Sequence, residues 1–216
     1  ALELVGRTMT VSQVLAEALE DVPFYRTAGG GLTLSGGEPL AQIAFAAALL
    51  SAARARSLHC AVETCGAVPR RHFARVLPLV DLFLFDLKET DPVRHRRSTG
   101  AGNRRIVGNL RWLAQAGASV RLRLPLVPGW NDRADHLAAA ADLAGELMPL
   151  EGIQVMPYHR LGTSKLARLG LPPQPQIEPP PRGRVEEWTG ALEARGLPVI
   201  RSDAAVAAPL TPVRCP

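Results

Sequence analysis

Cysteine, long apolar runs and lysine are all scarce in this sequence, and each scarcity narrows the class of protein. The three cysteines, Cys60, Cys65 and Cys215, are odd in number and show no C-x-x-C spacing. A disulfide framework is therefore not expected, and a reducing cytoplasm fits better. No apolar run is long enough to span a bilayer and no segment reads as a signal peptide, so we expect a cytoplasmic protein without a membrane partner.

The positive charge of the chain is carried almost entirely by arginine. Only two of the 25 basic residues are lysines, so a lysine in a prominent position suggests that a compact ammonium group is wanted there. The formal net charge is +5, with short arginine clusters at 70–71, 94–97 and 104–105. These clusters fit either a solvated basic face or a surface that meets an acidic partner or polyanion.

The length and composition fit one globular unit. With 216 residues, of which 47% are hydrophobic, the chain can bury a substantial core as a single domain. We expect this domain to cover 1–202 and a tail rich in alanine and proline to cover 203–216.

Two periodicities alternate along the chain. Helical spacing starts at 10–13 and recurs over 43–56, 69–77, 104–116, 133–148 and 185–195, with a proline-rich loop at 172–181. Strand-like runs lie between the helices, at 31–34, 58–63, 81–87, 119–127, 152–156 and 198–201, and the apolar run at 81–87 reads as a strand buried on both faces. This alternation predicts an α/β fold of repeated βα units with a parallel sheet or barrel.

The ends of the expected strands are rich in glycine and polar residues. The segments are 35–38 (SGGE), 63–66 (ETCG), 86–88 (DLK), 125–130 (PLVPGW) and 157–159 (PYH). Because sites in parallel βα folds gather at the carboxyl ends of the strands, we expect a binding or catalytic site at this edge.

Each segment also has a simpler explanation, which the residues alone leave open. Gly36-Gly37 fits a tight turn as well as a backbone left bare for a ligand. Glu38 fits a carboxylate in a first helical turn. Asp86 and Lys88, two apart on a strand, can form a plain ion pair, and His159 is compatible with a structural role.

Taken together, the segments are much more specific than any one alone. The series SGGEP, ETCG, DLFLFDLK, LPLVPGWND and VMPYHRLGTSKLARLG, in this order and spacing, closely resembles the glycyl radical enzyme activating enzymes. These belong to the radical S-adenosyl-L-methionine (SAM) superfamily, and pyruvate formate-lyase activating enzyme is their best known member. The resemblance runs from about Leu4 to Arg201 and implies a partial parallel (β/α)6 barrel of the radical SAM type.

The resemblance assigns the amino end of the cofactor to the first strand end. Gly36, Gly37 and Glu38 match the GGE motif that binds the methionine amino group of SAM, with the backbone at Gly37 as the expected contact. Side chains would then be absent so that a zwitterion can lie against the main chain. Glu63-Thr64 departs from the Asp-Thr often present at the second strand end, which puts any cation-binding role there in doubt.

The carboxylate end of the cofactor is assigned to later segments. The resemblance implies that Lys88 pairs with the methionine carboxylate, while Asp86 and His159 hold the surroundings of that carboxylate and the ribose. Leu87 lies between the two charged residues of the DLK segment. Arg123, on the LRLPLVPG strand, is a further candidate for the same pocket.

One expected element of the family is missing from this sequence. Radical SAM enzymes hold a [4Fe-4S] cluster with a CxxxCxxC loop, and this chain contains none. Cys65 has no second ligand nearby and is not expected to bind a metal. We expect the cluster ligands upstream of Ala1, before a ferredoxin-like insert, so that the chain would be the C-terminal part of a longer enzyme without its first barrel strand.

The resemblance implies the activity of the intact protein. SAM is cleaved reductively, and the resulting 5′-deoxyadenosyl radical takes a hydrogen atom from a glycine Cα of a partner glycyl radical enzyme. We further expect a flavodoxin or ferredoxin-type electron donor, a monomer, no nucleic acid partner, and docking of the partner on Arg94, Arg96 and Arg97. The suggested insert favours a dehydratase, decarboxylase or lyase as that partner.

Two other functions remain compatible with the residues. The chain could act as a cluster-less, inactive fragment that binds SAM or a partner, which iron analysis would distinguish from an active enzyme. It could also be a βα-barrel lyase that uses Lys88 as a Schiff-base nucleophile, which borohydride trapping would label.

Overall fold

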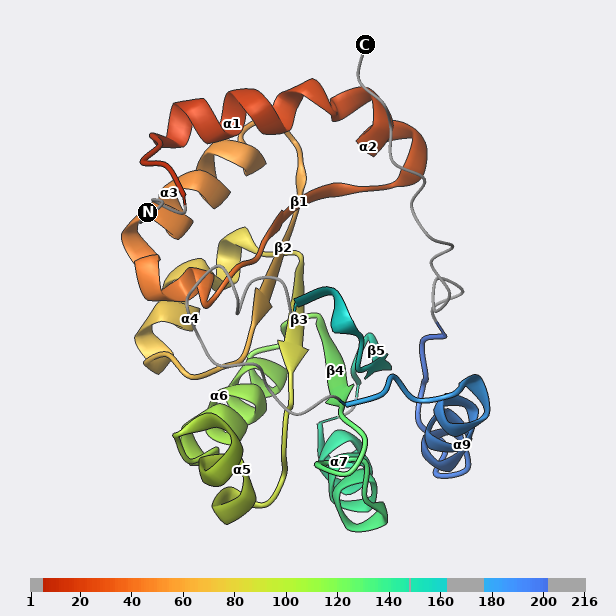
Figure 1. Ribbon diagram of the computed structural model, residues 1–216. Coiled ribbons are helices and arrows are strands. Elements are labelled where there is room, and N and C mark those ends of the chain that lie inside the picture. Colours follow the sequence, from red (N-terminus) through yellow and green to blue (C-terminus); the bar gives the residue numbers. More distant parts are fainter. Residues whose placement is uncertain (1–5, 148, 163–176, 202–216) are drawn as a thin grey trace, which may run out of the picture.

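The computed structural model describes residues 6–147, 149–162 and 177–201. In these ranges one parallel sheet has the strand order β1-β2-β3-β4-β5, with helices placed around its outer side (Figure 1). The strands are β1 (Gly31–Leu34), β2 (His59–Thr64), β3 (Leu82–Asp86), β4 (Val120–Leu126) and β5 (Gly152–Pro157). The α-helices are α1 (Val11–Glu20), α2 (Val22–Ala28), α3 (Ile43–Arg54), α4 (Arg70–Val76), α5 (Pro92–Thr99), α6 (Arg104–Gln115), α7 (Ala134–Glu146) and α9 (Arg182–Glu193). Three short 3-10 helices are η1 (Pro39–Gln42), η2 (Leu77–Leu79) and η3 (Arg160–Gly162).

Local sequence signals account for where several helices begin. Thr10 caps α1 through a capping box, in which its hydroxyl accepts from Gln13 N and the Gln13 side chain accepts from Thr10 N. Pro39 occupies the first turn of η1, where its missing N–H costs nothing. These starts confirm the helices expected from the sequence to within one to three residues, Met148 and 163–176 lying outside the described residues.

Two helices escaped sequence prediction because they lack an apolar stripe of useful length. The helix α2 has only seven residues and contains a proline in its first turn. The helix α5 buries only His95, and its ends are fixed by Asp91, which accepts from Val93 N and Arg94 N, and by the left-handed Gly100. Caps rather than hydrophobic periodicity define α5.

The core lies between the outer face of the sheet and the helices. Phe83 and Phe85 of β3 are at most 1% exposed, and the Phe73 ring of α4 lies 6.1 Å and 6.4 Å from their ring centroids. Leu84 and Asp86, on the opposite face of β3, remain partly exposed. The expectation that 81–87 is buried on both faces is therefore wrong, because the inner face of the sheet stays accessible.

The last expected strand is reduced to a single bridge. Over 198–201 only Val199 pairs, with Ile153 of β5, through hydrogen bonds from Ile153 N to Pro198 O (2.8 Å) and from Ile200 N to Ile153 O (2.7 Å). Pro198 has no N–H to extend the ladder. The described residues thus form a five-stranded sheet, where the sequence predicted six strands. Among the described helices, none has the length and apolar character needed to cross a membrane.

Candidate functional site

All five strands run in the same direction, so their carboxyl ends lie along one edge of the sheet. The loops that leave this edge carry every strand-end segment singled out in the sequence. The parallel topology thus places these segments in one region of the molecule, as expected for a βα fold.

The backbone at Gly36 and Gly37 is exposed and unobstructed. Gly36 has a φ of +125°, which favours glycine, whereas Gly37 has no such backbone requirement. A Cβ built at either position would meet no atom of the described residues within 4 Å, apart from the adjacent residues in the chain. A tight turn therefore explains Gly36 but not Gly37, and the open space over Gly37 fits a ligand that lies against the main chain.

Glu38 fastens this loop to the end of β2. Its carboxylate accepts from the Thr64 hydroxyl (2.9 Å), from Cys65 N (3.1 Å) and from Leu40 N (3.2 Å). The last of these contacts makes Glu38 the N-cap of η1. Glu38 therefore fixes the position of the Gly36-Gly37 backbone relative to β2, and its oxygens are largely occupied by the chain itself.

Arg123 of β4 joins two carboxylates from different strands. Its Nε donates to Asp86 Oδ1 (2.9 Å) and its Nη2 to Glu63 Oε1 (2.7 Å). The register of the sheet pairs Asp86 with Arg123 directly, so the bridge follows from strand alignment. Only 12% of the Arg123 side chain and 14% of the Asp86 side chain are exposed, which makes this a half-enclosed network on the inner face.

Arg123 acts to lower the pKa of both carboxylates of this network, yet their net pKa shifts have opposite signs. Burial raises the pKa of Asp86 above its ordinary value, and the nearby charges of Arg123 and Lys88 do not fully offset that effect. Burial also acts to raise the pKa of Glu63, but the hydrogen bond and charge of Arg123, with Ser35 and Lys88, lower it overall. Unequal burial thus separates the pKa values of two carboxyl groups that share one arginine.

Lys88 is exposed at the end of β3 and forms no ion pair with the described residues. The plain Asp86–Lys88 pair that the sequence left open is therefore not formed, because Asp86 is committed to Arg123. Lys88 still lies close enough to Glu63 and Asp86 to affect their pKa values. Its ammonium group is available to an anionic ligand at the carboxyl ends of the strands.

Sequence reasoning missed the asparagines that hold the loop carrying Lys88. Asn131 Nδ2 donates to the carbonyl oxygens of Lys88 and Pro125, both at 2.7 Å. Asn103 Nδ2 donates to the carbonyl oxygens of Glu89 (3.0 Å) and Thr90 (2.7 Å). Both asparagines are buried, and no sequence pattern signalled their role, because it depends on burial and on carbonyl partners that only the tertiary structure shows.

A buried ionisable cluster supports the same loop from behind. Glu89, which is 4% exposed, accepts from Arg133 Nη2 at 3.0 Å. His136 is fully buried, its Nδ1 accepts from Thr90 N at 3.2 Å, and burial lowers its pKa. A neutral His136 and a paired Glu89 therefore fix the start of the segment between β3 and α5.

The loop after β2 is held in an equivalent way. Asn109 of α6 donates to the carbonyl oxygens of Gly66 (2.9 Å) and Val68 (2.8 Å). Gly66 has a φ of +74°, and a Cβ there would lie 2.2 Å from Phe85 Cζ. Glycine at this position is thus required by both backbone conformation and packing.

The remaining candidates from the sequence have less defined surroundings. His159 is exposed just beyond β5, with its ring making no hydrogen bond to the described residues. The Leu87 side chain is buried in the core, and its N–H donates to Arg123 O at 2.9 Å. Contacts unite Asp86 and Arg123 but do not link Gly37, Lys88 and His159 within the described ranges.

The described cysteines do not form a cluster site. The Cys65 thiol lies 3.2 Å from Glu38 Oε2, and Cys60 is buried, with its pKa raised by that burial. No group of three metal-ligating side chains occurs in the described ranges. The donor set of these residues does not fit an iron–sulfur cluster, whereas the open backbone at Gly37 and the unpaired Lys88 fit a zwitterionic ligand.

A parallel βα sheet with polar loops at one edge defines a partial-barrel fold, a class in which sites lie at the carboxyl ends of the strands. The family model described as the radical SAM superfamily matches residues 3–142. The chain belongs to this superfamily, whose cofactors are SAM and a [4Fe-4S] cluster.

The chain is also similar to several activating enzymes. It is 47% identical, over 76% of its length and 54% of the relative's, to the isethionate sulfite-lyase activating enzyme of Nitratidesulfovibrio vulgaris. It is 37% identical, over 92% of its length and 62% of the relative's, to the benzylsuccinate synthase activating enzyme of Thauera aromatica. The chain thus spans somewhat more than half the length of these relatives, and the resemblance to activating enzymes is confirmed.

A solved structure supports the fold. The crystal structure of a domain of pyruvate-formate lyase-activating enzyme from Bacteroides vulgatus matches with a TM-score of 0.67 at 26% identity, covering 79% of this chain and 98% of that one. The expected partial barrel of the radical SAM type is confirmed.

Proposed function

We propose that this chain supplies the SAM-binding part of an activating enzyme that generates a glycyl radical on a partner enzyme. Membership of the radical SAM superfamily and the names of the relatives support this function. The observation that carries it is Lys88, which forms no ion pair with the described residues, next to a Glu63–Arg123–Asp86 network whose carboxylates are already committed. This arrangement leaves one free ammonium group for the carboxylate of SAM.

In this proposal the candidate residues at the carboxyl edge of the sheet bind or position the methionine part of SAM. The Gly37 backbone contacts the methionine amino group, with Gly36 providing the turn and Glu38 anchoring the loop. Lys88 pairs with the methionine carboxylate.

The other proposed roles lie on the inner face and beyond β5. Asp86 and Arg123 shape the pocket beside the carboxylate, Leu87 fixes the backbone between Asp86 and Lys88, and His159 reaches the ribose. Burial of the Arg123 network supports a rigid floor for the ligand.

The bound cofactors supply the one-electron cleavage of SAM and the abstraction of hydrogen from a glycine Cα. The residues of this chain bind SAM and fix its orientation. The relatives' names support a lyase or synthase as the partner class. A flavodoxin or ferredoxin-type donor, a monomeric state and a cytoplasmic location complete the proposal.

SAM binding by two variants tests this function. In equilibrium dialysis, Lys88→Gln should weaken SAM binding about 10- to 100-fold, the cost of losing a charge-assisted hydrogen bond. Gly37→Ala should weaken it by at least about tenfold. The physical reason is that a methyl group there would meet no atom of the described part of the chain beyond its neighbours, so it would obstruct the ligand.

Arg56→Gln is the matched control. Arg56 is exposed just beyond α3 and forms no ion pair with the described residues, so its loss changes the net charge as Lys88→Gln does. The control should bind SAM as the wild type does. Wild-type affinity in both Lys88→Gln and Gly37→Ala would overturn the proposed site.

A further inference from the structure

Three successive helices carry a one-sided charge. The helices α4, α5 and α6 contain three arginines each and no aspartate or glutamate. Acidic residues that flank these helices in the sequence form ion pairs with other segments or cap a helix. Asp86 and Glu89 pair with arginines from other segments, and Asp91 caps α5.

Most of these arginines have no carboxylate partner. Within the described residues only Arg111 of the nine forms an ion pair, with Glu146 at 2.7 Å. We call the other eight the arginine face: Arg70, Arg71, Arg75, Arg94, Arg96, Arg97, Arg104 and Arg105. All eight are exposed.

The arginines in and next to α9, in contrast, pair with carboxylates. Around α9, Arg182 pairs with Glu186, Arg184 with Glu187, and Arg195 with Asp142. Positive charge is therefore paired locally around α9, whereas the eight arginines of the arginine face have no ion pair within the described residues. An uncompensated field of one sign attracts and orients an oppositely charged partner.

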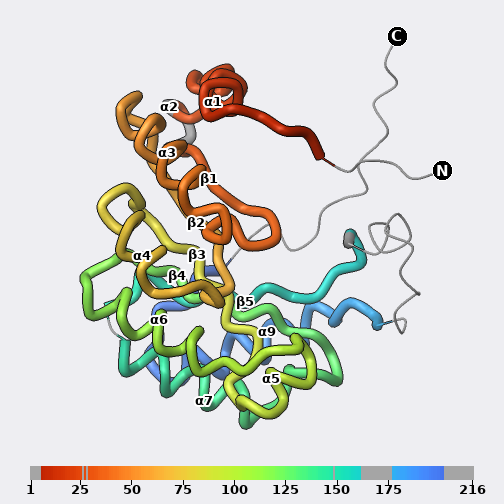
Figure 2. The backbone as a smooth tube through the Cα atoms, turned by 90° about the vertical axis from the view of Figure 1, so that its left-hand side faces the viewer, coloured from red at the N-terminus to blue at the C-terminus, as the bar shows by residue number. Residues whose placement is uncertain are grey.

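The three helices form one continuous side of the molecule. Figure 2 shows α4, α6 and α5 next to one another on the side that faces the viewer. Contacts between the helices agree with that view, because Arg70 Nη2 lies 3.9 Å from a Cβ built at Gly108 of α6. Arg96 Nη2 of α5 lies 3.6 Å from a Cβ built at Gly102, just before α6.

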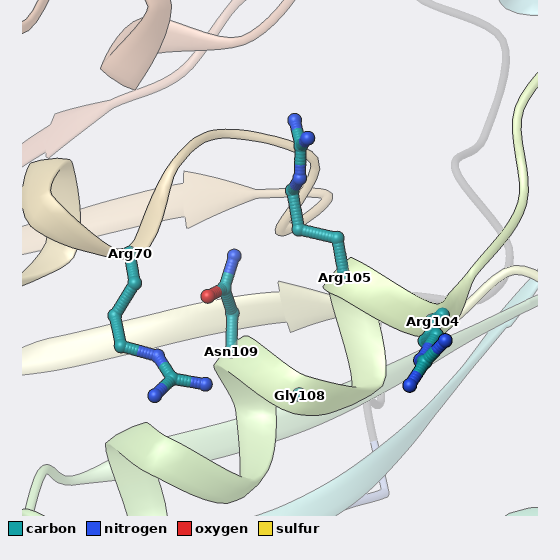
Figure 3. Close-up of a pocket in the computed structure, with 5 residues that line it drawn as sticks. All are labelled: Arg70, Arg104, Arg105, Gly108 and Asn109. Atoms are coloured by element: carbon teal, nitrogen blue, oxygen red, sulfur yellow. The ribbon is translucent and has the colours of Figure 1, made fainter.

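A hollow lies within this side, between α4 and α6. Arg70, Arg104, Arg105, Gly108 and Asn109 line an open cavity of about 560 Å³ (Figure 3). Gly108 contributes no side chain, which keeps the hollow open. The amide nitrogen of Asn109 is used by the loop after β2, so the hollow is joined rigidly to the strand edge.

The chemistry of this surface selects an acidic protein as its occupant. Arginine guanidinium groups bind carboxylates in a bidentate manner, and the hollow is bordered by three of them. Aromatic side chains for stacking nucleic acid bases are not exposed on the three helices, because Phe73 is buried and Trp112 partly buried. Charge complementarity therefore favours aspartate and glutamate side chains over single-stranded nucleic acid.

We propose that the arginine face docks an acidic protein surface, with partner carboxylates bound along the hollow that Arg70, Arg104 and Arg105 line. The inference rests on charge and shape alone and does not require the proposed SAM chemistry. It shifts the centre of docking from Arg94, Arg96 and Arg97, expected from the sequence, to α4 and the start of α6.

Fluorescence anisotropy with a labelled decaglutamate peptide at low salt, without SAM, tests this docking site. The triple variant Arg70→Gln, Arg104→Gln, Arg105→Gln should weaken peptide binding by about tenfold or more. Gly108→Leu should weaken it by about threefold or more without changing any charge, because leucine fills the hollow and suits a helix.

The triple variant Arg182→Gln, Arg184→Gln, Arg195→Gln is the matched control, since it removes the same charge from paired arginines. It should change peptide binding less than about twofold, in line with a rim charge far from the contact. Equal weakening by the two triple variants would show that only net charge matters and would overturn the proposal. A labelled single-stranded DNA ten-mer that binds more tightly than the peptide, with the same dependence on Arg70, Arg104 and Arg105, would also overturn it.

Discussion

At the scale of single residues, the site is organised by one arginine shared between two strands. Arg123 holds Asp86 and Glu63 at hydrogen-bond distance and leaves Lys88 without a partner among the described residues. The consequence is an ammonium group, free of ion pairs within the described residues, beside two carboxylates that share a single guanidinium. That distribution suits a ligand carrying both a carboxylate and an ammonium group.

The opposite pKa shifts of the two carboxylates predict opposite effects of pH on stability. The pKa of Glu63 is lowered in the folded state, so its charge contributes stability that is present above its ordinary value of 4.5 and is lost as pH falls. The pKa of Asp86 is raised, so ionising it above its ordinary value of 3.8 costs stability as pH rises.

Urea denaturation of Glu63→Gln and Asp86→Asn between about pH 3 and pH 7 measures these effects. Relative to wild type, the unfolding free energy of Glu63→Gln should fall progressively as pH rises, while that of Asp86→Asn should rise progressively. Each variant serves as the other's control, since both neutralise a partner of Arg123. Parallel pH trends for the two variants would contradict the opposite assignment of the shifts.

At the scale of elements, buried asparagines tie the loops at the carboxyl edge to the helices and strands behind them. Asn131 holds Lys88 and Pro125, Asn103 holds Glu89 and Thr90, and Asn109 holds Gly66 and Val68. Each asparagine donates from one amide group to two backbone carbonyls, which links two points of the chain to its own position. Loops held in this way can present a ligand-binding backbone with little conformational freedom.

Comparing Asn131→Ala with Asn109→Ala distinguishes an effect on the position of Lys88 from a general loss of loop stability. Asn131→Ala removes two hydrogen bonds to carbonyls and one from Val127 N, and Asn109→Ala removes two to carbonyls, so each should lose about 1–3 kcal/mol of unfolding free energy. Only Asn131→Ala should also weaken SAM binding, by about three- to tenfold, because only Asn131 holds the carbonyl of Lys88.

Calorimetric binding of SAM, with folding checked by thermal melts, measures both quantities for the two variants. A matched loss of stability with unequal SAM affinity is the expected pattern. If Asn109→Ala weakened SAM binding as much as Asn131→Ala, the positioning role of Asn131 would be wrong.

At the scale of the whole molecule, hydrophobic periodicity was sufficient to predict five strands and most helices in their correct order. It failed for α5, whose limits depend on Asp91 and Gly100 rather than on an apolar stripe. It also overestimated 198–201, where Pro198 limits pairing to one bridge, and the burial of 81–87, whose inner face is open. Periodicity shows how apolar and polar residues alternate along a segment, but it does not show how completely a neighbouring layer of the structure covers that segment.

The location of the candidate site residues was predictable, but their pairings were not. Strand ends and the resemblance predicted that Gly36, Gly37, Asp86, Lys88 and Arg123 lie at the carboxyl edge of the sheet, and the structure places them on β3, on β4 and in the loops that follow β1 and β3. Which carboxylate Arg123 would bind depends on the register of β3 against β4, which places Asp86 beside it. The roles of the asparagines likewise depend on tertiary contacts that no local pattern encodes.

The most direct test of the account is a titration of the isotopically labelled chain with SAM, followed by the chemical shifts of its backbone amides. If SAM binds at the carboxyl edge of the sheet, the shifts are saturable and largest at Gly37 and Lys88, with smaller shifts along the carboxyl ends of β1 to β4. Shifts confined to the opposite edge of the sheet, or an unperturbed Gly37 and Lys88 at saturating SAM, would contradict it.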